Sequence, residues 1–506
     1  MSIADSNLTT APSETHERKI ILLLCLLAAV HVFIFSATFP FFNNVDEQVH
    51  LDLVVRYSHL EIPRAIDTPC AEVLPFISVY GTIEYLWPPE SQPGKRIPPP
   101  PWTLPINVIA QNLVDKEAIW KAVVKNHEAS QPPLYYSLAG LWWHLGKLLG
   151  FDGGHLLYWL RFLNILAVIA LVWLGHLAAR LIFPENCFVR LGVPALIALI
   201  PQTAFYSIQN DVLSPVCFGA AFVCLIKLWR AEVPDARLGI FAGITLAATF
   251  LTKISNLPLL AVSAAVVLFK SWQLAKAGKF RAASPALAAL ALCAGLPMGA
   301  WLAWCKHAFG DFSGTAAKIQ FLGWTHKAFA EWWHHPIFTP HGLWTFLSGL
   351  IATFWQGEIL WDRKPLALPS ADMIYVLSSI IFVGIALLNL LPHSKNATMA
   401  QRRALWFGFF CFAAAVTFLG FLSTIYDFHD CFYPSREHPY FTSGRLMLGA
   451  LIPFLLLFVY GLDRALKKFS NAAKFSALTG LVLFMLVTEI TIDWPIFPNP
   501  YNWFHM

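Results

Sequence analysis

Two adjacent acids, Asp46 and Glu47, follow the first long apolar segment, and His50 comes three residues after Glu47. A carboxylate at bilayer depth costs about 2.5–3.5 kcal/mol on insertion scales, so an acid pair at the edge of a membrane segment needs a reason. One carboxylate can take the proton of an acceptor hydroxyl, and a second can hold a divalent cation. We therefore predict that Asp46 and Glu47 are catalytic acids at the membrane surface, with Glu47 and His50 as candidate metal ligands.

Other polar residues are expected at the same membrane face. Carboxylates and cations that converge there would suit a negatively charged lipid head group and a hydroxyl acceptor, because Arg and Lys bind phosphate. With His50, the predicted substrate-binding residues are Gln131, Asp211, Lys253, Gln356, Glu358, Arg436 and Arg445.

Several of these residues also have a purely structural interpretation. Asp46 and Glu47 could begin a helix, where acids favour the N-terminus. Asp211 could cap a membrane span, and Lys253 could extend its ammonium group to the membrane surface. Their common side of the membrane favours the functional interpretation.

The elements that must position these residues are membrane helices. The chain has 506 residues, of which 57% are hydrophobic and 13% are charged, about half the charged fraction of a soluble protein. Segments 20–38 and others of similar length match a hydrocarbon core of about 30 Å. We predict an all-α polytopic membrane protein with about eleven spans, near 20–39, 156–182, 188–208, 211–229, 238–252, 257–270, 285–305, 372–392, 404–425, 446–462 and 475–492.

The basic residues give this topology an orientation. Arg230, Lys276, Arg403, Lys474 and most other basic residues between spans fall on the side of the N-terminus. By the positive-inside rule that side is cytoplasmic, and the C-terminus lies outside.

Residues 1–19 have the composition of a disordered cytoplasmic tail, and residues 20–506 are expected to form one membrane domain. Its long outer loops are 40–155, 306–371 and 426–445. Within them we predict an amphipathic helix on the membrane at 48–60, a juxtamembrane helix at 131–149 and a re-entrant segment at 346–354. A disulfide between Cys70 and Cys431 is left open.

The order of these features resembles the GT-C superfamily of polytopic glycosyltransferases. The Asp-Glu pair after the first span is similar to the one in that superfamily. Residues Gln131-Pro132-Pro133-Leu134-Tyr135-Tyr136 resemble a segment of the protein mannosyltransferase and aminoarabinose transferase branches. Asn210-Asp211, Thr252-Lys253, Phe354-Trp355 and Gly444-Arg445 also resemble segments of bacterial members.

The resemblance implies a bacterial inner-membrane enzyme that transfers a sugar from a polyprenyl-phosphate carrier on the outer face, usually with inversion. Asp46 would be the base or orienting acid, and Glu47 would assist it or share a metal. The acceptor would be a glycan, a lipid or a protein, and membrane lipid is a further partner. Nucleic acid is not expected. Three alternatives stay open: a transporter or flippase of a lipid-linked glycan, a polymerase or ligase of surface polysaccharide, and an inactive scaffold.

Overall fold

The computed structural model describes residues 14–43, 46–81, 90, 93–96, 98–361, 364–392, 396–431 and 433–505. In these residues the fold is all-α apart from two pairs of two-residue strands, which confirms the predicted class. Most of the predicted tail, residues 1–13, lies outside the described residues, and Glu14 to Lys19 are already helical. The helices are α1 (Glu14–Thr38), α2 (Glu47–Ser58), α3 (Leu74–Tyr80), α4 (Ile106–Val123), α5 (Leu134–Leu148), α6 (Gly153–Arg161), α7 (Leu163–Ile182), α8 (Cys187–Ala198), α9 (Ser214–Arg230), α10 (Ala236–Thr252), α11 (Leu257–Lys276), α12 (Phe280–Phe309), α13 (Thr315–Phe321), α14 (Pro340–Gln356), α15 (Pro369–Leu390), α16 (Met399–Ile425), α17 (Leu451–Ala465) and α18 (Asn471–Asp493).

The chain is an integral membrane protein with many spans. Within the described ranges, nine helical segments are long and apolar enough to cross a membrane, and two shorter apolar helices are α8 and α10. These segments coincide in place with the predicted spans. The predicted third span, 188–208, is too long, because α8 ends at Ala198. Pro201 accounts for this end, since a proline disfavours helical geometry at the residue before it.

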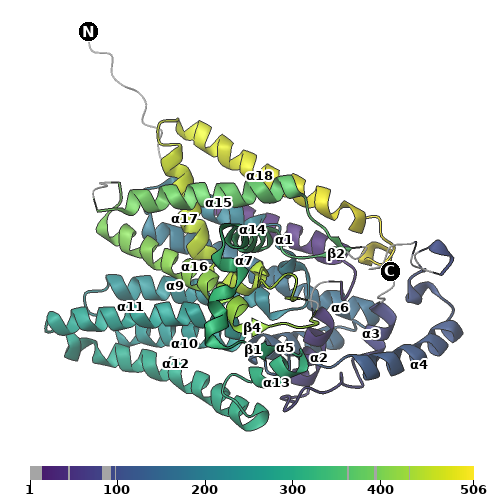
Figure 1. Cartoon of the computed structure of the whole chain (residues 1–506). Coiled ribbons are helices and arrows are strands. Elements are labelled where there is room, and N and C mark those ends of the chain that lie inside the picture. The colour runs from purple at the N-terminus through teal and green to yellow at the C-terminus, as the bar shows by residue number, and fades with distance from the viewer. Residues whose placement is uncertain are drawn as a thin grey trace.

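The long helices lie side by side and run across the view in Figure 1. Helices α3, α4 and α6 lie towards the right of that view, as does the C-terminus, and α2 and α5 lie nearer its centre. We call this end of the bundle, where α1 ends and α9 and α11 begin, the loop end. The connection between α8 and α9, residues 199–213, consists of two short 3-10 helices (Thr203–Tyr206 and Asn210–Leu213) with irregular backbone around them, and it is almost wholly buried there. Irregular backbone at membrane depth is tolerated when protein surrounds it.

The helix predicted at 48–60 forms as α2, but its predicted position on the membrane surface is wrong. It packs against α5, and nine of its twelve residues are buried. Asp52, on what would be the polar face, is fully buried and accepts hydrogen bonds from Arg56 Nε, Asn126 Nδ2 and the backbone of Cys70. These partners, which neutralise and solvate Asp52, allow the helix to sit inside the protein.

The remaining loop-end segments are joined by short strands. Strand β1 (Thr325–His326) pairs with β4 (Tyr426–Asp427), and β2 (Leu360–Trp361) pairs with β3 (Lys364–Pro365). The predicted juxtamembrane helix is α5, and the predicted re-entrant segment lies within the 17-residue α14. Cys70 and Cys431 are both free, so the disulfide left open between them is not formed.

Candidate functional site

Glu47 makes a buried ion pair with Arg161 at the end of α6. The Nε and Nη2 atoms of Arg161 donate to the two carboxylate oxygens over 2.8 and 2.7 Å, and both side chains are at most 1% exposed. The backbone amides of Phe42 and Ile208 also donate to Glu47, over 2.8 and 2.9 Å. Glu47 therefore ties together the end of α1, the start of α2, the end of α6 and the connection before α9.

The guanidinium of Arg161 has further partners. Its Nη atoms donate to the carbonyls of Ser36, Phe39 and Pro40, which include carbonyls left unpaired at the end of α1. Both Glu47 oxygens and these Arg161 donors are engaged. The pair therefore fixes the backbone between the end of α1 and the start of α2, which carries Asp46.

Asp46 faces a different set of partners from its neighbour. It lies in the left-handed region with φ 64°, which is uncommon for a residue other than glycine, and its side chain does not cap α2. Instead Oδ1 lies 3.3 Å from His127 Nε2, and Oδ2 accepts a hydrogen bond from Arg445 Nη2 over 3.3 Å. The two acids do begin α2, as the structural interpretation expected, but the side chain of Asp46 contacts His127 and Arg445 instead of the helix and is 22% exposed.

Arg445 brings three carboxylates to one guanidinium. Besides Asp46, its Nη1 lies 3.1 Å from Asp211 Oδ2, and its Nε lies 3.8 Å from Glu358 Oε2. Lys253 Nζ donates to both oxygens of Asp211 over 2.6 Å. Asp211 and Lys253 are buried together, so neither the capping nor the surface interpretation of these residues holds. Five segments far apart in sequence thus meet at this point.

A second group adjoins the first and shares Asp46 with it. Asp46, His127 and Glu128 each offer one ligand atom, and these atoms lie within 4.8 Å of one another. Glu128 also accepts hydrogen bonds from Lys318 on α13 and, over 2.5 Å, from Gln131 Nε2. We call Asp46, His127 and Glu128 the triad. Within the described part of the chain it is the group suited to a metal ion, and it contains neither Glu47 nor His50.

His127, Glu128 and Lys318 were not predicted from the sequence. A signal for the first two was present, because a His-Glu pair stands two residues before the Gln131-Pro132-Pro133 segment. No comparable signal marks Lys318, which reaches Glu128 from 190 positions further along the chain.

The charges in this site shift the pKa values of its groups. Burial raises the pKa of Asp46, but the hydrogen bond and charge of His127, with Arg445 and Lys318, outweigh it and hold the pKa well below its usual value. Burial likewise opposes the effect of Lys318 and His127 on Glu128, whose pKa is lowered to about 2. For His127, burial lowers the pKa, but the bond to Asp46 and the charge of Glu128 raise it overall. Asp46 and Glu128 are therefore ionised at neutral pH, and their charges stabilise the protonated form of His127.

The pKa values of Glu358 and His50 shift in the direction that favours their neutral forms. Burial raises the pKa of Glu358, although Arg445 and the hydroxyl of Ser443 oppose the shift. His50 donates to or accepts from the Tyr136 hydroxyl over 2.8 Å, and burial lowers the pKa of His50 to about 4. Its Nε2 atom is buried and has no hydrogen-bond partner among the described residues. His50 is thus a neutral imidazole beside the site.

Gln356 and Arg436, predicted as substrate-binding residues, lie apart from this cluster. The amide of Gln356 donates to Asp372 at the start of α15 over 2.7 Å. Arg436 pairs with Asp427 and His429 on the exposed loop after β4, and its side chain is 61% exposed. The structure therefore brings together Asp46, Gln131, Asp211, Lys253, Glu358 and Arg445, with His50 next to them.

Comparisons with known proteins place the chain in a family. The family described as "Predicted membrane protein (DUF2142)" matches residues 30–424. No curated protein sequence matches the chain.

Solved structures of one archaeal enzyme, the oligosaccharyltransferase of Archaeoglobus fulgidus, are similar to this chain. The complex with Zn and sulfate has 12% identity and a TM-score of 0.39, and the match covers 95% of this chain and 52% of that chain. The complex of this enzyme, AglB, with an inhibitory peptide and a dolichol-phosphate has 11% identity, a TM-score of 0.41 and coverages of 95% and 55%. The apo form has 10% identity, a TM-score of 0.40 and coverages of 96% and 55%. The chain thus spans about half the length of these structures.

Proposed function

The chain belongs to the DUF2142 family of predicted membrane proteins, and we propose that it is a glycosyltransferase. It moves a sugar from a polyprenyl-phosphate carrier to an acceptor hydroxyl at the loop end of the bundle, and it inverts the anomeric carbon. Arg445 carries this proposal. One guanidinium joins Asp46, Asp211 and Glu358 beside Lys253, so acids that can bind protons and cations that can bind phosphate share one site within a membrane protein.

In the proposed reaction, Arg445 and Lys253 bind the phosphate of the donor. Asp46 is ionised and partly exposed, and it takes the proton of the acceptor hydroxyl. The acceptor oxygen bonds to the anomeric carbon while the bond from that carbon to the phosphate oxygen breaks. The polyprenyl phosphate leaves with both electrons of the broken bond. Glu47 does not touch the reactants; through Arg161 it fixes the backbone that carries Asp46.

An apolar groove between α11 and α16 suits the prenyl chain. Its volume is about 1040 Å³, and Ala261, Ala265, Phe410 and Phe418 are among its lining residues. Pro258 lines it near the start of α11, five residues after Lys253. A prenyl chain in this groove would bury apolar surface while its phosphate lay near Lys253 and Arg445.

The triad fits a divalent cation. Carboxylate oxygens suit Mn²⁺ and Mg²⁺, and an imidazole nitrogen suits Zn²⁺ and other transition metals. A metal held by Asp46, His127 and Glu128 would supply positive charge near the leaving phosphate.

Metal binding to the triad should strengthen as pH rises. The pKa of His127 is raised above its usual value near 6.5, so its proton must leave before Nε2 can bind a metal. Titration of Mn²⁺ into the reconstituted protein at a series of pH values should show the apparent affinity increasing until His127 is neutral.

Two variants sharpen this test. His127→Ala removes a ligand and should weaken Mn²⁺ binding by about 10–100-fold. Lys318→Ala removes a cation that competes for Glu128 and should strengthen it. A pH-independent affinity, or the same affinity in all three proteins, would contradict the triad as a metal site.

We propose that the loop end faces outward and that the N-terminus is cytoplasmic, because basic residues gather at the opposite end. In a variant without Cys70 and Cys431, a cysteine at Ile106 on α4 should react with an impermeant reagent added outside intact cells. A cysteine at Lys276 should react only after the membrane is permeabilised. Both positions are exposed, so accessibility within the protein is matched. The reverse pattern would overturn the orientation.

One observation favours a transporter as the second candidate. His31 on α1 and Glu489 on α18 form a buried hydrogen bond of 2.7 Å within two spans, and the hydroxyl of Tyr206 donates to the same carboxylate. Ionisable groups inside a membrane often mark ion or proton pathways. A transporter would move the donor across the bilayer without breaking the bond between its sugar and its phosphate. An assay of that bond therefore distinguishes the two functions.

The function is tested by reconstituting the protein in vesicles with a panel of polyprenyl-phosphate sugars and a crude envelope acceptor fraction. We expect free polyprenyl phosphate to be released from one or a few donors. Movement of donors across the bilayer with no release from any donor would favour the transporter instead.

A further inference from the structure

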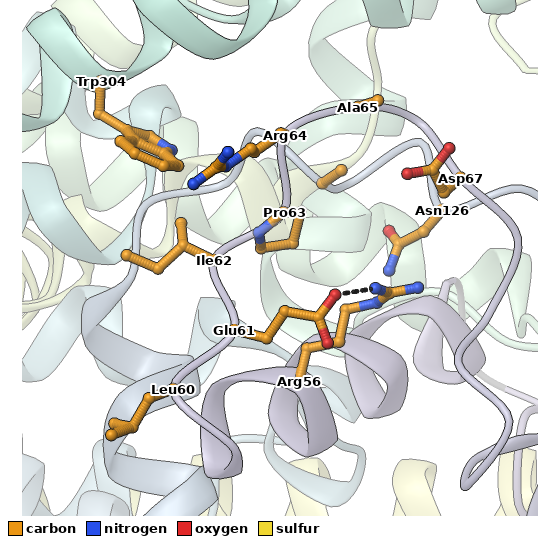
Figure 2. A pocket seen from close by; sticks show the side chains of 11 residues that line it. Arg56, Leu60, Glu61, Ile62, Pro63, Arg64, Ala65, Asp67, Asn126 and Trp304 are labelled. Atoms are coloured by element: carbon orange, nitrogen blue, oxygen red, sulfur yellow. Dashed lines mark hydrogen bonds and ion pairs between the residues drawn. The ribbon is translucent and has the colours of Figure 1, made fainter.

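A cavity at the loop end lies beside the triad but has no part in the chemistry described so far. Its volume is about 490 Å³, within the range of small-molecule sites. It lies between the end of α2, the segment that follows α2, the turn before α5 and the end of α12 (Figure 2). Its lining includes Arg56, Glu61, Arg64, Asp67, Asn126 and Trp304.

One turn of the chain joins this cavity to the triad. Asn126 and Ala129 line the cavity, and the two residues between them, His127 and Glu128, belong to the triad. The turn is held on both sides. The Asn126 backbone amide donates to the Asp67 carbonyl over 2.8 Å, and its side-chain amide donates to Asp52 over 2.7 Å. A molecule in the cavity would therefore lie against the wall whose other side carries the proposed reaction.

The cavity lining has two basic side chains, Arg56 and Arg64, and two acidic ones, Glu61 and Asp67. Figure 2 shows Arg56 paired with Glu61, and Arg56 also donates to Asp52 and to the Thr68 carbonyl, over 2.6, 2.9 and 2.9 Å. Two charged side chains remain for a ligand, Arg64 and Asp67, and neither forms an ion pair with another described residue. One offers donors and the other offers acceptors.

Trp304 and Ile62 give the cavity wall an aromatic and apolar part. The Arg64 guanidinium lies over the Trp304 ring, 5.6 Å from its centroid, and so is held at the cavity edge. Figure 2 shows Ile62 below Trp304 on the same side of the cavity. A suitable ligand must present hydroxyl groups that both donate and accept, together with a less polar surface.

We infer that this cavity binds a saccharide unit of the acceptor that lies away from the reacting hydroxyl, an inference that rests on the proposed glycosyltransferase function. A saccharide carries hydroxyls that donate and accept and a C–H face that packs on apolar side chains. A phosphorylated ligand fits less well, because Arg56 is already satisfied and a single arginine remains. The prenyl chain has its own groove, whose lining is almost wholly apolar.

The test measures binding directly, with the full-length protein in nanodiscs and no donor present. The probes are the methyl glycosides of glucose, galactose, mannose and N-acetylglucosamine, observed by saturation-transfer-difference NMR. We expect saturable binding of at least one probe with Kd of about 1 mM. Asp67→Asn should weaken it about tenfold, since it replaces a charged acceptor at the cavity wall. Asp115→Asn, which alters an exposed acid on α4, is the matched control and should bind as the wild type does.

A second variant guards against a misfolded protein. Arg64→Ala changes an exposed side chain and should weaken the same probe while thermal stability is unchanged. Saturable binding that Asp67→Asn and Arg64→Ala both weaken supports the inference. It is overturned by no saturable binding of any probe, by binding that neither variant changes, or by tighter binding of a control peptide than of every glycoside.

This outcome is distinguishable from failure of the proposed function. If vesicle assays show sugar transfer that Asp67→Asn leaves unchanged at every acceptor concentration, the enzyme stands and the acceptor site is elsewhere. If no donor is ever split, but glycosides bind the cavity and the variants lose them, saccharide recognition stands and the transferase assignment fails.

Discussion

Asp46→Asn should lower the rate of sugar transfer by about 10²–10⁴-fold, the usual contribution of a general base. Asparagine keeps the size of the side chain and can still accept a hydrogen bond from Arg445, but it cannot take a proton from an acceptor. The low pKa of Asp46 means that this carboxylate is ionised throughout the working pH range. The measurement is the initial rate of polyprenyl-phosphate release in vesicles at saturating donor.

Stability serves as the control for this variant. The side chain of Asp46 is 22% exposed, and its contacts with His127 and Arg445 are both 3.3 Å long. The cations that lower the pKa of Asp46 also stabilise the folded state, so the melting temperature should fall to some degree, and transfer is measured well below it. Full transfer activity in a folded Asp46→Asn protein would remove Asp46 from the catalytic role.

Glu47→Gln, one residue away, should have the opposite pattern. It leaves Arg161 as a buried charge without its anion, and breaking such a pair costs about 3–5 kcal/mol. The amides of Phe42 and Ile208 also lose a carboxylate oxygen. We expect a large fall in melting temperature or loss of folded protein, measured by thermal denaturation in nanodiscs.

Two further proteins test the cause of that loss. Glu72→Gln removes an acid whose pair with Lys147 is 33–40% exposed, and it should change stability little. Glu47→Gln combined with Arg161→Met removes both buried charges and should regain part of the stability. Recovery should be incomplete because Arg161 also binds the carbonyls of Ser36, Phe39 and Pro40. Normal stability in Glu47→Gln alone would contradict the positioning role.

The sequence predicted the helices well because apolar segments of membrane length need no tertiary information to be recognised. It also placed Asp46, Asp211, Lys253, Glu358 and Arg445 at one end of the bundle. Alternation of spans confines residues at span ends to one of two faces, which is enough to predict that they share a side. It cannot predict which of them touch.

The errors come from contacts between distant residues. Glu47 and Asp46 look alike in sequence, but Arg161, 114 positions away, pairs with one of them only. The burial of α2 depends on Asn126 and Arg56 satisfying Asp52, which periodicity does not report. Gln356 and Arg436 have the right chemistry and the expected side, but Asp372 and Asp427 bind them elsewhere. The error at the end of α8 has a local cause instead, because Pro201 is a helix-ending signal that the sequence itself contains.

The central claim is that the loop end splits the bond between a sugar and a polyprenyl phosphate. The most direct measurement uses a donor labelled with ³H in the sugar and ³²P in the phosphate, in vesicles that contain wild-type protein or the Asp46→Asn variant. We predict that the wild type separates the two labels, with ³H entering the acceptor fraction and ³²P remaining in lipid, and that the variant does not. Labels that stay together in wild-type vesicles, while the donor crosses the bilayer, would contradict the account.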